Sequence, residues 1–411
     1  MAEANKVCVV DDNSTTIQHV TIVLEQAGYR VAATTDSTQA VDWIVTEQPQ
    51  AVLLDIMMPQ VDGMEILRQI RNIPALDNLP IIMLTAKTYD YDKKLAMDLG
   101  ANGFINKQAN WSERLLEQLD RSLKDNLHIQ FWGVRGTLPA PGARNIRYGG
   151  NTSCITLSMP DGQLFIFDAG TGIKALSNHL VATGRAKRLE AKLFISHPHW
   201  DHINALPFFA PLYLQGTDIE IFGPSQQAVT MEQVISEQMN GVYFPIKIRE
   251  FAARVHFRDL GEESIKMRGV NIDTMLLSHP GNCLGYRIRY KNRRFCYVTD
   301  NELYPSGSEF HNPRYVERLV DFCQGADVLV TDATYTDAEY QSKVHWGHSP
   351  ISEVAKLAHA AEVRQLCLHH HDPDQSDADI DNKLAICRRQ LAAAGSATQV
   401  IAPSEEDVLT I

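Results

Sequence analysis

Cysteine, long apolar runs and strongly basic stretches are scarce or absent in this sequence. The seven cysteines are scattered and form no Cys-x-x-Cys pair, which argues against a disulfide framework and a cysteine-based zinc site. No apolar stretch approaches the length that spans a bilayer, and the first residues show no signal-peptide pattern. We therefore expect a cytoplasmic protein without membrane contact.

The charge and the length of the chain further limit the class of protein that this sequence can encode. The net charge of −12 is shared equally between the first 124 residues and the rest, so neither part offers the basic face of a nucleic-acid binder. At 411 residues and 44% hydrophobic content, the chain can form two or three globular domains. A nucleic-acid partner is not expected.

The first part of the chain alternates strand-like and helix-like segments. We expect strands at 6–10, 30–34, 51–54, 81–84 and 103–105, and helices at 16–27, 38–47, 64–73, 92–99 and 111–123. This alternation predicts an α/β domain with a doubly wound, five-stranded parallel sheet. Its functional site should lie at the carboxyl ends of the strands.

Polar residues stand at those strand ends. Asp11 and Asp12 follow the first strand, and Asp55, Thr85 and Lys107 follow the third, fourth and fifth. Three carboxylates at one sheet edge suit Mg²⁺, which prefers oxygen ligands. A hydroxyl and an ammonium group beside them can hold a phosphoryl group.

With the segment Asp55-Ile56-Met57-Met58-Pro59 and Gly63, this set resembles the receiver domain of bacterial response regulators. The resemblance implies that Asp55 is the phosphoacceptor and that Mg²⁺ binds Asp11, Asp12 and Asp55. It implies that Thr85, Lys107 and Phe104 sense the phosphoryl group. A sensor histidine kinase or a phosphotransfer protein is the implied partner. Gln108 departs from the family, which usually carries proline there.

The domain boundary is expected soon after the last helix. We expect a receiver domain at 1–124, a short linker at 125–128 and a second domain at 129–411. The linker lacks the Gly, Ser or Pro content of a long tether, so the domains should pack near each other. We also expect a homodimer.

The second domain is rich in strands, and its helices come in between. Strand-like runs occur at 154–157, 164–167, 193–196, 219–222, 254–257, 275–278, 285–290, 295–299 and 328–331, and helical patterns at 172–183, 225–239, 313–323, 351–361 and 378–394. Strand-rich halves that are each followed by helices predict two sheets packed face to face with helices outside.

A chelating cluster follows the strand-like run at 193–196. It reads His197-Pro198-His199-Trp200-Asp201-His202, and imidazoles with a carboxylate suit zinc or another first-row metal. Later candidates also follow strand-like runs, namely His279, Asp300 and one of His369, His370 and His371. Together these residues make a dinuclear site plausible.

This pattern resembles the signature of the metallo-β-lactamase superfamily over essentially all of 129–411. The resemblance implies an αββα fold and two divalent transition metals, zinc first, with manganese or iron as alternatives. One metal would take His197, His199 and His279, the other Asp201, His202 and His370, and Asp300 would bridge them. Such a pair lowers the pKa of a water molecule and clamps the oxygens of the group under attack.

Further segments resemble the phosphodiesterase branch of that superfamily, which includes ribonuclease Z and bacterial cyclic-nucleotide phosphodiesterases. They are Gly133–Pro139, Gly149–Cys154, Phe167–Gly172, Thr299–Glu302 and Trp346–Ser349. The resemblance implies that His348 contacts the scissile phosphate. Asp332, which follows the strand-like run at 328–331, is the candidate that orients His348, and Asp201 completes the expected catalytic set. Asp168 would support the metal loop. No Gly/Lys-rich insertion precedes His279, which favours a small or cyclic phosphodiester over transfer RNA.

The sequence thus predicts a two-component response regulator with an enzymatic output. The output would be a metal-dependent phosphodiesterase regulated by phosphorylation at Asp55. Two alternatives stay open: a carboxylic ester, lactone or thioester hydrolase on the same fold, and a non-catalytic signalling adaptor. The sign of the regulation is also left open.

Overall fold

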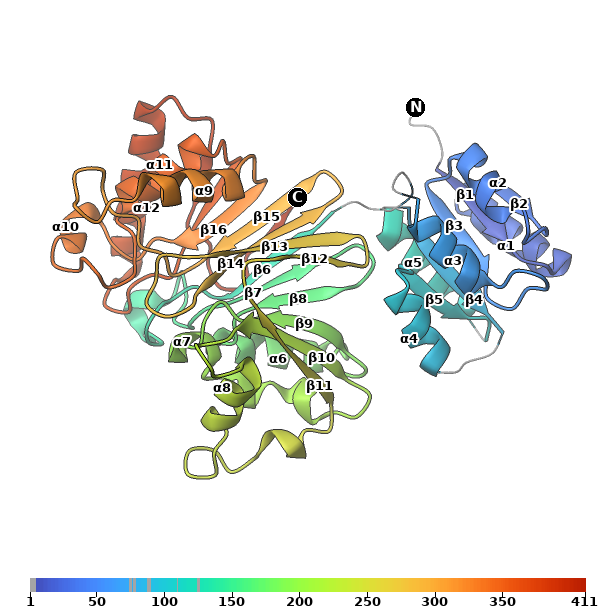
Figure 1. Ribbon diagram of the computed structural model, residues 1–411, viewed down its shortest axis with the longest axis horizontal. Coiled ribbons are helices and arrows are strands. Elements are labelled where there is room, and N and C mark those ends of the chain that lie inside the picture. The colour runs from blue at the N-terminus through green and yellow to red at the C-terminus, as the bar shows by residue number, and fades with distance from the viewer. Residues whose placement is uncertain (1–4, 74–75, 77–78, 87–89, 109, 124–125) are drawn as a thin grey trace. The chain divides into compact units, whose positions relative to one another are not determined.

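The structure is a computed structural model that describes residues 5–73, 76, 79–86, 90–108, 110–123 and 126–411 (Figure 1). Its contacts divide it near Asn126 into two units, which are described separately. Residues 124 and 125, at the expected boundary and linker, lie outside the described ranges. No helix in the described ranges is long and apolar enough to cross a membrane.

The first unit is a five-stranded parallel sheet in the order β2-β1-β3-β4-β5. Its elements are β1 (Lys6–Val10), α1 (Ser14–Gln26), β2 (Arg30–Thr34), α2 (Ala40–Glu47), β3 (Ala51–Asp55), α3 (Gly63–Arg71), β4 (Ile81–Thr85), α4 (Asp90–Asp98), β5 (Gly103–Asn106) and α5 (Trp111–Leu123). This is the doubly wound sheet that the alternating pattern predicts.

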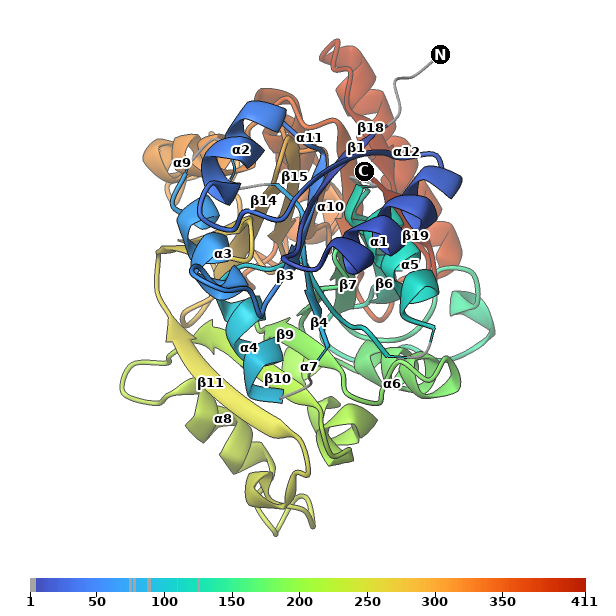
Figure 2. The ribbon, with the colours of Figure 1, turned by 90° about the vertical axis from the view of Figure 1, so that its right-hand side faces the viewer.

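Helices cover both faces of this sheet, which explains why β3 and β4 are buried along their whole length. Val20 and Leu24 of α1 share one core cluster with Leu115 and Leu119 of α5. Side chains of α2, α3 and α4 form a second cluster on the opposite face (Figure 2). The carboxyl ends of the strands therefore stay free at one edge.

The second unit contains two seven-stranded sheets. One has the order β11-β10-β9-β8-β7-β6-β19 and the other β12-β13-β14-β15-β16-β17-β18. The first is built from β6 (His128–Gly133), β7 (Cys154–Ser158), β8 (Leu164–Phe167), β9 (Glu190–Phe194), β10 (Asp218–Pro224), β11 (Arg254–Leu260) and β19 (Val408–Thr410). The second is built from β12 (Ser264–Met267), β13 (Val270–Leu276), β14 (Leu284–Tyr290), β15 (Arg293–Val298), β16 (Val328–Asp332), β17 (Gln365–His369) and β18 (Gln399–Ile401).

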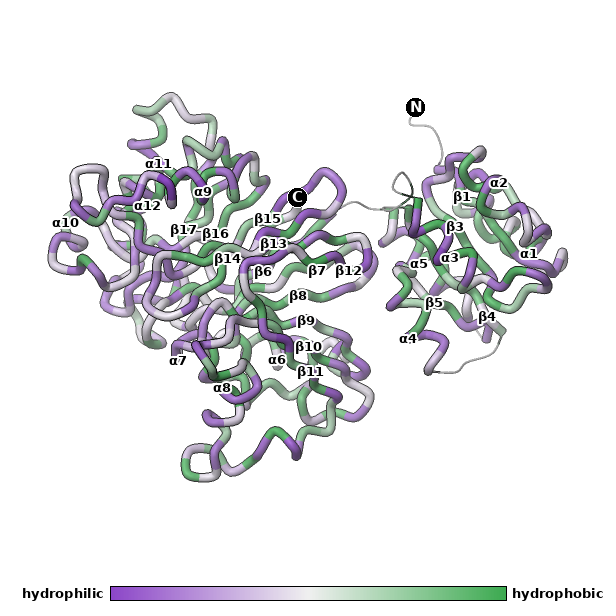
Figure 3. The backbone as a smooth tube through the Cα atoms, viewed as in Figure 1, coloured by the Kyte–Doolittle hydropathy of each residue, from purple (hydrophilic) through white to green (hydrophobic). Residues whose placement is uncertain are grey.

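Aromatic side chains join the two sheets. The Phe167 ring of β8 lies 6.0 Å from the Tyr286 ring, 5.3 Å from Phe295 and 5.4 Å from Tyr297, all in the second sheet. These rings are fully buried, and offset or tilted aromatic pairs at such distances are favourable. The sheets thus pack face to face. Hydrophobic residues recur along many of their strands (Figure 3).

Helices cover the outer face of each sheet. The helices are α6 (Gly172–Ala182), α7 (Trp200–Ile203), α8 (Met231–Gln238), α9 (Pro313–Cys323), α10 (Asp337–Tyr340), α11 (Ile351–Ala360) and α12 (Asp377–Ala393). Residues of α6 and α8 share a core cluster with the first sheet, and residues of α9, α11 and α12 share one with the second (Figure 1). The predicted αββα class is confirmed.

One predicted helix begins later than expected. The pattern at 225–239 predicts a helix from Ser225, but α8 begins at Met231. Thr230 caps it by accepting a hydrogen bond from the Gln233 backbone, and Gln226 and Val229 form an isolated bridge before it. A capping box overrides the apolar periodicity, because the cap satisfies the first free N–H groups of the helix.

Candidate metal centre and phosphorylation site

The loops that follow four strands carry the chelating residues of the second unit. His197 and His199 lie between β9 and α7, whereas Asp201 and His202 lie within α7. His279, Asp300 and His370 follow β13, β15 and β17. His370 is held in left-handed backbone with φ of 58°, a strained conformation that is typical of functional sites.

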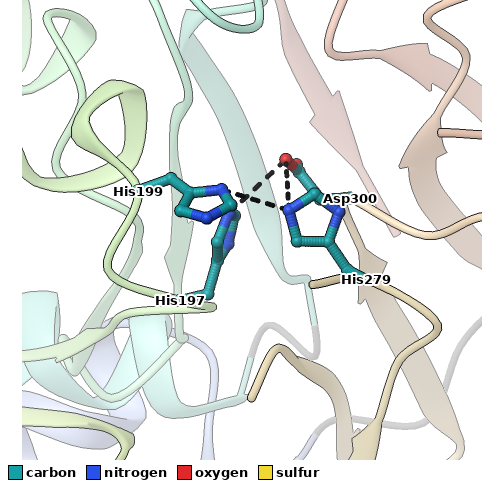
Figure 4. A group of neighbouring side chains, drawn as sticks. All are labelled: His197, His199, His279 and Asp300. Atoms are coloured by element: carbon teal, nitrogen blue, oxygen red, sulfur yellow. Dashed lines mark hydrogen bonds and ion pairs between the residues drawn. The ribbon is translucent and has the colours of Figure 1, made fainter. Parts of the chain in front are cut away.

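The structure gathers four of these residues into a first group (Figure 4). His199 Nδ1 lies 3.1 Å from His279 Nε2. Asp300 Oδ2 lies 3.5 Å from His197 Nε2 and 3.7 Å from His279 Nε2. All four ligand-type atoms are within 4.8 Å of one another.

A second group shares Asp300 with the first. His370 Nε2 lies 3.1 Å from Asp201 Oδ2 and 3.3 Å from His202 Nε2. Asp300 Oδ1 is 3.3 Å from His202 Nε2 and 3.2 Å from His370 Nε2. Because Oδ1 faces one group and Oδ2 the other, Asp300 has the geometry of a bridging carboxylate. Its role as a ligand, like that of the other residues, stays a prediction.

Hydrogen bonds determine which nitrogen of each imidazole is free. His279 Nδ1 donates to the Gly347 carbonyl at 2.9 Å, and His202 Nδ1 donates to Asp168 Oδ2 at 2.7 Å. Each Nε2 therefore turns a lone pair toward its group. The buried Nε2 of His197 has no hydrogen-bond partner in the part of the chain that the structure describes.

The two groups differ in their electrostatics. Burial lowers the pKa of His197, His199 and His279 below the usual value, so these imidazoles are neutral. Burial alone would raise the pKa of Asp201 and Asp300. The facing His202 and His370 outweigh it and hold both pKa values well below the usual range.

The donor set fits two divalent cations. Burial lowers the pKa of His202, but Asp201, Asp300 and Asp168 raise it well above the usual value, so this group calls for a positive charge between its atoms. Neutral imidazole nitrogens and carboxylate oxygens are the donors that zinc and similar metals prefer. A cation in each group would take the place of a proton and would bind the nitrogen and carboxylate atoms that face one another.

His348 and Asp332 form a third group with His370. His348 Nδ1 donates to Asp332 Oδ2 at 2.8 Å, and the His348 ring stacks on the His370 ring at 4.9 Å. Burial lowers the pKa of His348, but Asp332 outweighs it and raises the pKa to about 9. The structure therefore brings the predicted catalytic pair to the second group, while its catalytic role stays a prediction.

The two neighbours of His370 are placed elsewhere. His369 Nε2 donates to the Gly133 carbonyl at 3.0 Å, and neither His369 nor His371 belongs to a chelating group of the described residues. The His370 ring packs directly on the backbone of Gly136, where a Cβ atom would lie only 2.1 Å from the ring. This close packing fixes the position of the ring.

Supporting contacts that sequence reasoning missed come from distant segments. Thr334 Oγ1 lies 3.1 Å from His370 Nδ1, and the Tyr297 hydroxyl donates to Asp168 at 2.7 Å. Neither residue belongs to a motif. Glu302 does, in Thr299–Glu302, and its buried carboxylate accepts hydrogen bonds from the backbone of His345 and Gly347. It thereby holds the loop that carries His348.

The receiver-type site lies at the strand ends of the first unit. Lys107 Nζ lies 2.7 Å from Asp11 Oδ2 and 2.6 Å from Asp55 Oδ1. Burial raises the pKa of Asp55, and the raised value persists although Lys107 opposes it. Asp12 is exposed and Thr85 is buried at the end of β4.

The predicted Mg²⁺ ligands are not clustered as tightly as the histidine groups. Asp11, Asp12 and Asp55, all of them described, do not appear among the groups whose ligand atoms lie within 4.8 Å. The ammonium of Lys107 lies between Asp11 and Asp55 and offsets part of their negative charge. Phe104, the predicted switch residue, is half-buried and packs against the core on the α2–α4 face.

The αββα layers and the histidine–aspartate groups at their strand ends define a metallo-β-lactamase fold, and the preceding sheet defines a receiver fold. The family described as the response regulator receiver domain matches residues 7–120, and the beta-lactamase superfamily domain matches residues 164–371. The chain belongs to the beta-lactamase superfamily and carries an N-terminal response regulator receiver domain.

Solved structures resemble each part. The metallo-beta-lactamase fold protein YhfI from Bacillus subtilis is 18% identical, with a TM-score of 0.50, covering 70% of this chain and 100% of that chain. Human tRNase Z, short form, is 23% identical, with a TM-score of 0.46, covering 69% and 98%. The chemotaxis protein CheY4 of Vibrio cholerae is 31% identical, with a TM-score of 0.28, covering 29% and 99%.

Proposed function

We propose that this chain is a response regulator whose second domain hydrolyses a small phosphodiester with two divalent metals, zinc first. The observation that carries the proposal is the His348–Asp332 pair beside the two chelating groups. Cleavage of a phosphodiester needs neutralisation of the phosphoryl oxygens and a proton for the leaving oxygen. The site offers residues for both tasks.

The chain's own residues divide the work. His197, His199 and His279 would hold one metal, Asp201, His202 and His370 would hold the other, and Asp300 would contribute to both. When bound, two such metals supply Lewis acidity and a nucleophilic water near neutral pH. Asp168 fixes the His202 ring through its Nδ1 hydrogen bond, and Thr334 contacts the His370 ring. Both rings thus keep Nε2 turned toward the metal.

His348 acts on the substrate rather than on the metals. Its Nδ1 is committed to Asp332, so Nε2 remains to donate a hydrogen bond to the phosphate or a proton to the leaving oxygen. The buried Asp332 carboxylate stabilises the imidazolium that carries this proton. Asp332 is in turn fixed by the Thr334 hydroxyl, which donates to its Oδ1 at 2.6 Å.

The receiver domain regulates this activity through Asp55. Asp11, Asp12 and Asp55 would hold Mg²⁺, which would neutralise phosphoryl oxygens. The Asp55 carboxylate takes a phosphoryl group from the phosphohistidine of a sensor histidine kinase or a phosphotransfer protein in the cytoplasm. The added charge lies within reach of Lys107, which already pairs with Asp55. Thr85 and Phe104 then repack, in a two-state switch.

A substrate panel tests the enzymatic part. Metal content is measured on purified protein, and bis-p-nitrophenyl phosphate, cyclic nucleotides, a lactone and a thioester are assayed in parallel. We expect hydrolysis of phosphodiesters with about two equivalents of metal bound. Faster hydrolysis of the lactone or thioester would replace the proposal by the ester hydrolase. A metal-loaded protein that is inert toward every substrate would be an adaptor.

Intact-mass spectrometry tests the regulatory part. Incubation with acetyl phosphate and Mg²⁺ should add the mass of one phosphoryl group, as an acid-labile adduct. Asp55→Asn should abolish the adduct, whereas Asp42→Asn, which removes an exposed carboxylate of α2, should keep it. We expect phosphorylation to change the hydrolysis rate or the oligomeric state. An adduct that persists in Asp55→Asn would show that another residue is the phosphoacceptor.

A further inference from the structure

Two tryptophan side chains beside the candidate metal centre are exposed. Trp200 is 81% exposed and Trp346 is 57% exposed. Exposure of so large an apolar ring forgoes the stabilisation that burial gives. Aromatic side chains beside polar ligand-binding groups are typical of sites for small molecules.

Both indoles extend from backbone that adjoins the same pair of histidines. Trp200 directly follows His199, and Trp346 directly precedes Gly347. His199 Nδ1 lies 3.1 Å from His279 Nε2, and His279 Nδ1 donates to the Gly347 carbonyl at 2.9 Å. The backbone of both tryptophans therefore adjoins residues that form or contact the first chelating group. His199 is itself exposed, so the centre opens to solvent on this side.

The backbone at both tryptophans is held in place. Glu302 accepts hydrogen bonds from His345 N at 2.7 Å and Gly347 N at 2.8 Å, which brackets Trp346 on both sides. Gly347 has φ of 84°, and a Cβ atom there would lie 2.3 Å from His279 Nδ1, so only glycine permits this approach. Trp200 begins α7, and its carbonyl accepts from Asn204 N at 2.7 Å.

A lysine adds charge to this rim. Lys343 Nζ lies 3.8 Å from the centroid of the Trp346 ring, a cation–π contact. The rim thus combines flat aromatic surface with a positive charge, next to a centre that suits a phosphate. The Trp200 side chain is largely exposed, which leaves its ring available to a ligand.

We propose that Trp200 and Trp346 bind a planar ester group of the substrate by stacking, and so select aryl or heteroaryl phosphodiesters over alkyl ones. The phosphodiester part rests on the proposed function. The negative net charge of the chain favours a small substrate over a nucleic-acid polymer. Stacking of one ring on an aromatic side chain changes affinity by about 5- to 140-fold.

A pair of substrates with one leaving group tests the selection. Phenyl p-nitrophenyl phosphate and methyl p-nitrophenyl phosphate both release p-nitrophenolate and differ only in the ester group that remains. We expect wild type to prefer the phenyl ester in kcat/KM by about tenfold. Trp200→Ala and Trp346→Ala should each lower this ratio, and Trp200→Phe should keep part of it. Tyr243→Ala removes another exposed ring, 81% exposed, and should leave the ratio unchanged.

A binding measurement keeps this inference separate from the proposed function. Phenylphosphonate and methylphosphonate are not hydrolysed, and their affinities for the metal-loaded protein follow from quenching of tryptophan fluorescence. Tighter binding of phenylphosphonate that is lost in Trp200→Ala or Trp346→Ala would support the inference, even if no phosphodiester is hydrolysed. Equal affinities in wild type, or an unchanged preference in both alanine variants, would overturn it.

Discussion

The two sites balance their carboxylates in different ways. In the receiver domain Lys107 Nζ lies between Asp11 and Asp55, at 2.7 and 2.6 Å. In the second domain Asp201 and Asp300 face the imidazole nitrogens of His202 and His370 at 3.1 to 3.3 Å. The ammonium of Lys107 therefore offsets part of the negative charge of the receiver site, whereas only imidazoles face the carboxylates of the second site.

Lys107, which is half-buried, and Lys383, which is fully buried, differ in the same way, because among the described residues only Lys107 has carboxylate partners at contact distance. Burial lowers the pKa of Lys107, but its contacts with Asp11 and Asp55 outweigh this and raise it. Lys383 of α12 is fully buried and donates to neutral groups, the Thr334 carbonyl and Gln375 Oε1. Burial lowers its pKa to about 7, although more distant carboxylates oppose the shift. A partner at contact distance thus decides whether a buried lysine keeps its charge.

The largest expected effect comes from the shared carboxylate. Asp300→Ala should remove both metals and reduce hydrolysis to the background rate, because each oxygen serves one group. His199→Ala or Asp201→Ala should also abolish hydrolysis, but should remove only one metal equivalent. Metal content by mass spectrometry and the rate on bis-p-nitrophenyl phosphate measure both. A folded Asp300→Ala variant that retains two metals would refute the bridging assignment.

The second-largest expected effect is a loss of turnover when the His348–Asp332 pair is changed. His348→Ala should lower turnover by about 10²–10⁴-fold, the range for a general acid, with metal content near wild type. Asp332→Asn should lower it by about 10–100-fold, as is usual for a residue that orients another. Loss of a full metal equivalent from His348→Ala would place His348 among the ligands instead.

In the receiver domain, removal of the balancing charge should affect stability. Lys107→Met should lower the free energy of unfolding of this domain by about 3 kcal/mol, since it leaves two buried carboxylates without their partner. Added Mg²⁺ should restore part of the loss. Denaturant unfolding with and without Mg²⁺ measures this, and an unfolding transition that does not respond to Mg²⁺ would contradict the predicted ion site.

The smallest effect is a pH dependence in the second domain. Between about pH 7.5 and 9.5 the folded state holds Lys383 mostly neutral, with a pKa of about 7, while an unfolded lysine stays protonated. The unfolded state then binds the additional proton, so this group makes the free energy of unfolding rise with pH, by up to about 1.4 kcal/mol per unit. Lys383→Met should remove this slope.

Unfolding of the second domain at several pH values measures the slope. Lys174→Met, which changes an exposed lysine of α6, is the matched control and should keep the slope of wild type. A slope that is equal in wild type and Lys383→Met would mean that Lys383 keeps its proton in the folded protein.

Local sequence was enough for both fold classes and for the residues at the strand ends. The alternating pattern predicts the strands of the receiver domain, and Asp55 and Thr85 are the last residues of β3 and β4. The spacing after Leu366-Cys367-Leu368 favours His370, which is the member of its triplet that joins the chelating groups. Strands and the residues that directly follow them can be predicted from short stretches of sequence, because the pattern that indicates them involves only residues close in the chain.

Local sequence patterns did not predict the contacts between segments that are distant in the chain. The start of α8 was predicted too early, because apolar periodicity continues across a cap. β19 pairs with β6, so Val408 lies opposite Gln130 although almost the whole sequence of the second domain separates them. Thr334 and Tyr297 support the site from strands and loops that no motif connects to it.

The sequence by itself determined which residue types gather at the two sites, because strand ends place them at one edge of a sheet. Only the tertiary structure decided their charge and direction. It assigned Asp300 one oxygen for each group, turned Nε2 of His202 and His279 toward the centre, and placed Lys107 between two carboxylates while leaving Lys383 without one. These outcomes depend on distances of a few ångströms between segments far apart in the chain, and electrostatic energies change steeply over such distances.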